Sequence, residues 1–75
     1  MRPIAIVPRP GRAMGIELHG AITCLRNAGI SAYNAVNGRA CGLVWVDDEN
    51  VSMSVETLII DGFLAAALTQ SDLAH

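Results

Sequence analysis

Apolar residues in the first part of the chain follow two different periods. Residues 3–7 (PIAIV) form a compact run rich in isoleucine that ends at Pro8, which predicts a first strand. From Met14 onward, apolar residues recur at the three, four and seven spacing of one helix face, and they are Leu18, Ala21, Ile22, Leu25 and Ala28. The other positions of this predicted helix include the polar residues Glu17, Thr23, Arg26 and Asn27.

Two segments of the chain end in the same way. Leu25–Ala32 (LRNAGISA) and Leu58–Ala65 (LIIDGFLA) both consist of Leu, three residues, Gly, a large apolar residue, one residue and Ala. A glycine with positive φ, followed by an apolar residue that folds back on the last turn, is a common helix end. We therefore predict that two helices end at Gly29 and Gly62 and that a strand follows each of them.

The middle of the chain contains a hairpin signal. Residues 37–38 are Asn-Gly, which tolerate the positive φ of a type I′ turn, and they lie between two apolar segments. A two-residue turn here would pair Tyr33 with Gly42. In that register one face of the hairpin carries Tyr33, Val44 and Val46, and the other carries Cys41, Leu43 and Trp45.

Residues 51–60 fit two patterns. Val51, Met53 and Val55 alternate with polar residues, as in a strand, but Val51, Val55, Leu58, Ile59 and Gly62 also share one helical face. The Gly-Phe ending favours the helix, because it repeats the helix end at Gly29. The acidic residues 47–49 precede this helix, at a position where acids cap a helix start. Residues 63–68 (FLAAAL) are then predicted to form the last strand.

These elements follow the order β-α-β-β-α-β, which predicts an α+β fold of the ferredoxin-like type. In this fold a four-stranded antiparallel sheet carries both helices on one face, and residues 1–75 are expected to form a single domain. The first half is longer than the second, and the extra residues fall in the segment 8–15 (PRPGRAMG).

The composition narrows the classes of function. The chain has 75 residues, of which 52% are apolar and 16% charged, with a net charge of -2. It contains no lysine, and its five arginines are scattered, so we expect no basic face for nucleic acid. The first apolar run is too short for a signal or membrane segment, which predicts a cytoplasmic protein with reduced cysteines and no membrane association.

The segment 8–15 is the candidate binding loop. It holds two prolines, two glycines and two arginines and leads into the first predicted helix. Glycine lets backbone N–H groups approach a ligand, a helix N-terminus favours an anion, and Arg9 and Arg12 add positive charge. The alternative is an ordinary turn between strand and helix with two solvated arginines.

Four short stretches resemble the ACT domain, a regulatory module found alone or attached to enzymes of amino-acid metabolism. They are Pro10-Gly11, the turn in Leu25–Ser31, the strand Leu43–Asp47 and the helix Val55–Phe63. The resemblance implies a non-catalytic module that binds an amino acid or another small anionic metabolite at a dimer interface. It implies ligand contacts at Pro10, Gly11, Arg12 and Ala13, and Arg9 stands where the family has an acidic or polar residue.

Three other functions compete with this expectation. A protein-interaction adaptor or inhibitor, of the kind that phages and mobile elements encode, is the main alternative. An acylphosphatase-like hydrolase has the same element order and would use Arg12 and Asn34, but the predicted helix offers Leu18 and His19 where that family has its arginine. His19, Cys24 and Cys41 lack the spacing of metal ligands, so we expect no enzyme activity, no metal and no cofactor.

The hairpin predicts a homodimer. The strand 41–46 is apolar on both faces, and two helices can cover only one of them. The strand 31–36 is also an expected sheet edge without lysine or proline to prevent pairing. We therefore expect a two-fold dimer whose interface includes Tyr33, Leu43 and Trp45, unless residues 1–3 and 71–75 fold over the open face.

Overall fold

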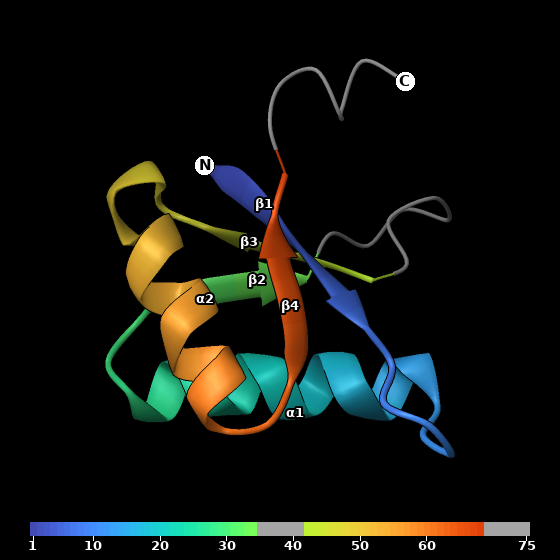
Figure 1. Cartoon of the computed structure of the whole chain (residues 1–75). Coiled ribbons are helices and arrows are strands. Elements are labelled where there is room, and N and C mark those ends of the chain that lie inside the picture. The colour runs from blue at the N-terminus through green and yellow to red at the C-terminus, as the bar shows by residue number, and fades with distance from the viewer. Residues whose placement is uncertain (35–41, 69–75) are drawn as a thin grey trace.

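A computed structural model describes residues 1–34 and 42–68 of the chain and confirms the predicted α+β fold (Figure 1). The elements in chain order are β1 (Arg2–Val7), α1 (Met14–Asn27), β2 (Ala32–Asn34), β3 (Leu43–Val46), a 3-10 turn (Asp48–Asn50), α2 (Val51–Ile60) and β4 (Leu64–Ala67). The four strands form one antiparallel sheet in the order β2-β3-β1-β4. This order and these directions are those of a ferredoxin-like sandwich.

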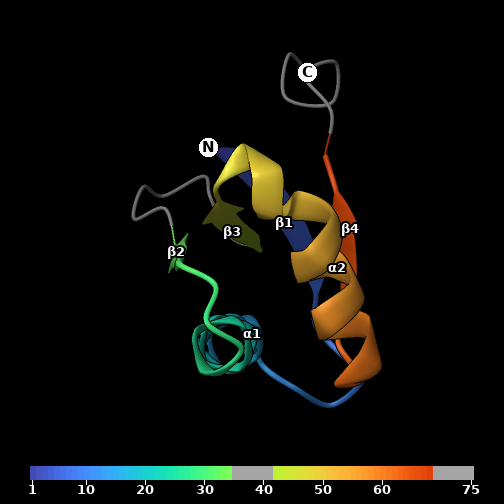
Figure 2. The same cartoon turned by 90° about the vertical axis from the view of Figure 1, so that its left-hand side faces the viewer.

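Both helices pack on the same face of the sheet (Figure 2). α1 contacts β1, β2 and β3, whereas α2 contacts β4 and β1. The residues between the two layers form one apolar core, and its fully buried side chains include Ile4, Leu25, Val44, Val46 and Leu58. β2 and β4 are the two edges of the sheet, with α1 and α2 respectively beside them.

The repeated sequence ending corresponds to the same helix cap in both halves. Gly29 has φ 83° and Gly62 has φ 96°, which places both in the left-handed region. The N–H of Ile30 donates to the carbonyl of Leu25 at 2.9 Å, and the N–H of Phe63 donates to the carbonyl of Leu58 at 2.9 Å. These bonds define a Schellman motif, in which the apolar residue after glycine folds back on the last turn.

The predicted hairpin register was wrong by three positions. Tyr33 pairs with Trp45 instead of Gly42, and Ala32 pairs with Val46. Because β3 also pairs with β1, its position is set by the sheet as well as by the turn. The observed register puts the small side chain of Ala32 in the core at 0% exposure and leaves the larger Tyr33 52% exposed on the opposite face. The Asn-Gly turn at 37–38 lies outside the described residues.

The helices cover the Val44 and Val46 face of β3. The opposite face carries Leu43 and Trp45, which are half-buried, and Tyr33, which is exposed. Pro3, which pairs with Trp45 on that face, is fully buried. The three residues expected at a dimer interface therefore lie together on the open face, and only one of them is largely exposed.

The helix over residues 51–60 is confirmed, but its buried face differs from the expected one. Ser54 and Leu58 are fully buried, whereas Ile59 is 55% exposed. The preceding acids do not cap α2, since neither Asp47 nor Asn50 makes a side-chain cap hydrogen bond. Asp48 instead forms a 3.1 Å salt bridge with the amino group of Met1. On α1 the expected apolar face is confirmed except at Ala28, which is exposed as the C-cap, and Glu17, which was expected to lie off that face, is buried.

Candidate functional site

The loop between β1 and α1 is built on a tight turn. The N–H of Arg12 donates to the carbonyl of Arg9 at 3.0 Å, so Pro10 and Gly11 are the two central residues of the turn. Gly11 has φ 80°, which with proline before it is typical of a type II turn. The proline and glycine of this loop therefore place Arg9 and Arg12 at the two ends of one turn.

Arg9 binds the carboxylate of Glu17 through a fork of hydrogen bonds. Its Nε donates to Oε2 at 2.9 Å and its Nη2 donates to Oε1 at 3.1 Å, while its backbone N–H reaches Oε2 at 3.4 Å. Glu17 is 1% exposed, and the Arg9 side chain is 26% exposed. Planar guanidinium matches carboxylate in this bidentate geometry, so the pair holds the loop against the first turn of α1.

The guanidinium of Arg9 also lies over the ring of Phe63, with 4.4 Å from its central carbon to the ring centroid. A cation at this distance is attracted by the face of an aromatic ring. Two glycines leave room for this stack: a Cβ on Gly20 would lie 3.2 Å from the Phe63 ring, and a Cβ on Gly62 would lie 3.3 Å from Nη1 of Arg9. Thus the loop, α1 and the turn between α2 and β4 meet at one guanidinium.

A groove of about 400 Å³ runs past this cluster. Its charged lining residues are Arg9, Arg12, Glu17 and Asp61, and its polar lining residues include Thr23 and Asn27. Arg12 has a side chain that is 54% exposed, and its Nη1 lies 3.8 Å from Oε1 of Glu17. The groove therefore presents two cations and two acids within one small surface.

The charges of this cluster support each other. Hydrogen bonds from Arg9 hold the pKa of Glu17 below its ordinary value of 4.5, and the positive charge of Arg12 acts in the same direction. Conversely, the hydrogen bonds to Glu17 raise the pKa of Arg9. The pair is therefore ionised at neutral pH.

A thiol lies farther along the same groove. Cys24 is half-buried, and burial raises the pKa of its thiol, with a further contribution from Asp61. The thiol is therefore protonated at neutral pH and is a weak nucleophile. His19 also lines the groove, but within residues 1–34 and 42–68 no three His, Cys, Asp or Glu side chains form a group that could hold a metal ion. Cys41 lies outside the described residues.

Of the five residues predicted to bind a ligand, the structure brings two to the groove. Arg9 and Arg12 line it, whereas Pro10, Gly11 and Ala13 are exposed and shape the loop. Ala13 is the N-cap of α1, and its carbonyl accepts the N–H of Glu17 at 3.0 Å. The groove does not bring together Arg12 and Asn34, the pair that a hydrolase would use, because Asn34 belongs to β2 and does not line the groove.

Three important residues of the cluster were not predicted from the sequence. The sequence pattern puts Glu17 among the polar positions of the first helix, Asp61 in the second helix end, and Phe63 in that end and at the start of the last predicted strand. A signal for Glu17 was present, since it is the one acid near two arginines of the preceding loop. The position of Phe63 depends on the packing of α2 beside α1, and a local pattern does not contain that information.

Comparisons with known proteins identify no relative: no protein-family description, no curated protein and no solved structure matches this chain. In the part of the chain that the structure describes, no helix is long and apolar enough to cross a membrane.

Proposed function

We propose that this chain is a small, non-catalytic binding module of the ACT-like kind, and that its groove binds a small metabolite that carries a carboxylate. The observation that carries the proposal is the Arg9 cluster, in which Glu17 and Phe63 hold a guanidinium at the groove before any ligand arrives. A preorganised cation loses little conformational freedom on binding, which favours affinity. A module of this kind acts in the cytoplasm, and binding of the metabolite changes its regulatory state.

The charges in the groove favour an amino acid over a simple anion. Arg9 donates its Nε–H and one N–H of Nη2 to Glu17, so its other N–H groups and the exposed Arg12 are the donors that remain for a ligand carboxylate. Asp61 lines the same groove and offers an acceptor for a ligand ammonium group. A zwitterion matches both signs of charge, whereas a dianion would face Glu17 and Asp61.

A thermal-shift screen against amino acids and small organic acids tests this function. A ligand at 100 times its Kd stabilises the folded state by about 2.7 kcal/mol, which raises the Tm of a small domain by about 10–20 °C. Arg12→Ala should abolish the shift, since it removes an exposed donor without leaving Glu17 unpaired. Arg2→Ala is the matched control, because Arg2 is exposed in β1 and does not line the groove.

A protein-interaction adaptor is the second candidate. The observation that favours it is the exposed apolar surface of α2, where Met53 is 57%, Ile59 55% and Ile60 79% exposed. If no compound in the screen raises the Tm of the wild-type chain, the ligand-binding proposal is wrong and the adaptor becomes the better description.

A further inference from the structure

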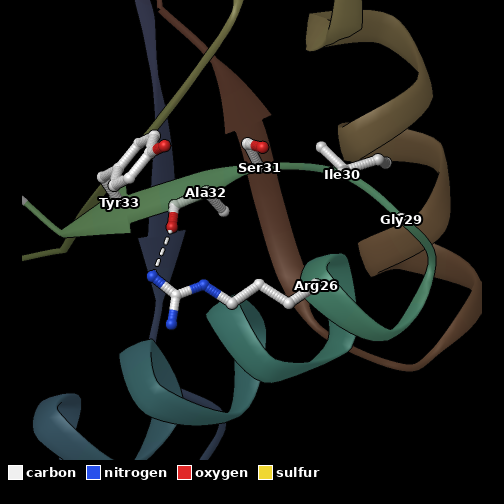
Figure 3. A pocket seen from close by; sticks show the side chains of 6 residues that line it. All are labelled: Arg26, Gly29, Ile30, Ser31, Ala32 and Tyr33. Atoms are coloured by element: carbon white, nitrogen blue, oxygen red, sulfur yellow. Dashed lines mark hydrogen bonds between the residues drawn. The ribbon is translucent and has the colours of Figure 1, made fainter.

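The two edges of the sheet differ in how their backbone groups are satisfied. Ala32 of β2 directs its carbonyl away from β3, and Nη2 of Arg26 donates to that oxygen at 3.0 Å (Figure 3). Arg26 lines a shallow hollow of about 340 Å³ together with Gly29, Ser31 and Tyr33. A charged side chain that covers an edge in this way opposes the addition of another strand. Arg26 therefore covers one carbonyl of the edge that the sequence indicated for dimerisation, and residues 35–36 of that predicted strand lie outside the described residues.

The β4 edge has no such cap within the described residues. The N–H of Leu68 donates to the carbonyl of Pro3 at 3.3 Å, so Leu68 faces β1. Because backbone groups alternate in direction along a strand, Ala66 also faces β1, and the N–H and C=O groups of Ala65 and Ala67 point outward. No hydrogen bond between described residues engages those four groups.

Apolar surface flanks the β4 edge on both sides. A hollow of about 490 Å³ lies along α2 beside Ala67, and a hollow of about 410 Å³ lies along Val7 and Leu64. Ile59 lines both hollows, and apart from Ser52 and Glu56 every residue that lines them is apolar. The β4 edge therefore has outward-pointing backbone N–H and C=O groups along the strand and apolar side chains on either side of it.

We propose that the β4 edge and the adjoining face of α2 bind a second copy of this chain, so that two sheets join into one across a two-fold axis at Ala66. In this arrangement Ala65 exchanges both backbone hydrogen bonds with Ala67 of the second copy, and Ala67 does the same with Ala65 of the second copy. The surface carries only one charged residue among those that line the two hollows, the exposed Glu56, so it is a poor match for a strongly charged partner. It complements a neutral strand edge flanked by apolar residues, which is what β4 itself presents.

The alanines of β4 suit this junction. Their side chains are small, so two α2 helices that lie on the same side of the joined sheet can approach each other and bury Ile59 and Ile60. The contact area is limited to one short strand and one helix of 10 residues. The dimer is therefore expected to dissociate within the micromolar range, as small interfaces do.

Sedimentation equilibrium of the wild-type chain across the micromolar range tests the proposal, together with two variants of nearly equal exposure on the same helix. Ile59→Lys should raise the dimer dissociation constant at least tenfold, because Ile59 lines both hollows. Met53→Lys should leave it unchanged, because Met53 lines neither. Circular dichroism checks that both variants are folded.

A third variant tests the strand edge itself. Ala67→Pro removes an N–H that points away from β1, so it should weaken the dimer while preserving the β1 ladder. A wild-type chain that stays monomeric throughout the range overturns the proposal. The proposal is also overturned if Ile59→Lys or Ala67→Pro is folded and dimerises as tightly as the wild type. Loss of the dimer in Tyr33→Glu alone would assign the interface to the open face. None of these residues lines the Arg9 groove, so ligand binding can fail while the dimer stands.

Discussion

The two β-α-β halves of this protein end their helices in the same way but begin them differently. Both helices stop at a left-handed glycine followed by a large apolar residue, with the same pair of backbone hydrogen bonds. α1, in contrast, begins after a loop that is held by the Arg9–Glu17 pair, whereas α2 begins after a 3-10 turn without a side-chain cap. A helix end can thus be encoded within a few residues, while a helix start can depend on a partner elsewhere in the chain.

The halves are also joined at one residue. Phe63 belongs to the cap of α2, where its N–H donates to the carbonyl of Leu58, and its ring supports the guanidinium of Arg9 from the other half. A residue placed by a local motif in one half therefore positions the candidate binding group of the other. Substitutions at matched positions of the two halves can distinguish the contribution of the repeated helix caps from that of the Phe63–Arg9 contact that joins the halves.

The largest effect is expected for the leucines that accept the cap bonds. Leu25 and Leu58 are both 0% exposed, so Leu25→Ala and Leu58→Ala should each destabilise the protein by about 2–5 kcal/mol. Chemical denaturation measures both, with Ile16→Ala as the exposed control, for which a change within about 0.5 kcal/mol is expected. A cost for Leu58→Ala far below that for Leu25→Ala would mean that the two leucine side chains do not contribute equally to the core, since alanine keeps the backbone carbonyl that accepts each cap bond.

A smaller effect, which differs between the halves, is expected for the cap glycines. Gly29→Ala and Gly62→Ala each place a side chain at positive φ, at a cost of about 1–2 kcal/mol. Gly62→Ala should cost more, because its Cβ would lie 3.3 Å from Nη1 of Arg9, whereas a Cβ on Gly29 meets nothing within 4 Å.

Gly15→Ala is the control for this pair. Gly15 lies in α1 without positive φ and has open space around it, so alanine should stabilise the protein by up to about 1 kcal/mol. Thermal denaturation ranks the three variants, and equal losses at Gly29 and Gly62 would argue against the contact between Gly62 and Arg9.

The last prediction concerns the loss of stability in acid, and the effect is confined to the first half. The pKa of Glu17 is lowered in the folded state, so its contribution to stability is present above about pH 4.5 and is lost as the pH falls through the lowered value. Tm measured against pH should therefore fall more steeply in acid for the wild type than for Glu17→Gln, and the two curves should converge at low pH. Glu56→Gln, which changes an exposed acid on α2, should follow the wild type, and parallel curves for Glu17→Gln would contradict the ion pair.

Much of the fold could be predicted from the sequence because its signals are local. The repeated Leu-to-Ala segments encode two helix caps whose hydrogen bonds join residues five positions apart, Leu25 with Ile30 and Leu58 with Phe63. These caps also resolved the ambiguity of residues 51–60 in favour of a helix. The arginines at Arg9 and Arg12 could be identified as candidate site residues for the same reason, since a glycine-rich loop before a helix is visible in the chain itself.

The tertiary structure alone decided the register of β2, the burial of Glu17 and the state of the two sheet edges. The register depends on β1, which pairs with β3 and aligns it against the core, so the Asn-Gly pattern did not predict the pairing of Tyr33. Glu17 is buried because Arg9 neutralises its charge, and Arg26 caps β2 because the α1–β2 turn brings it beside Ala32. Each of these outcomes depends on contacts between segments that are separate in the sequence, and a hydrophobic pattern records which residues prefer burial without recording what they meet there.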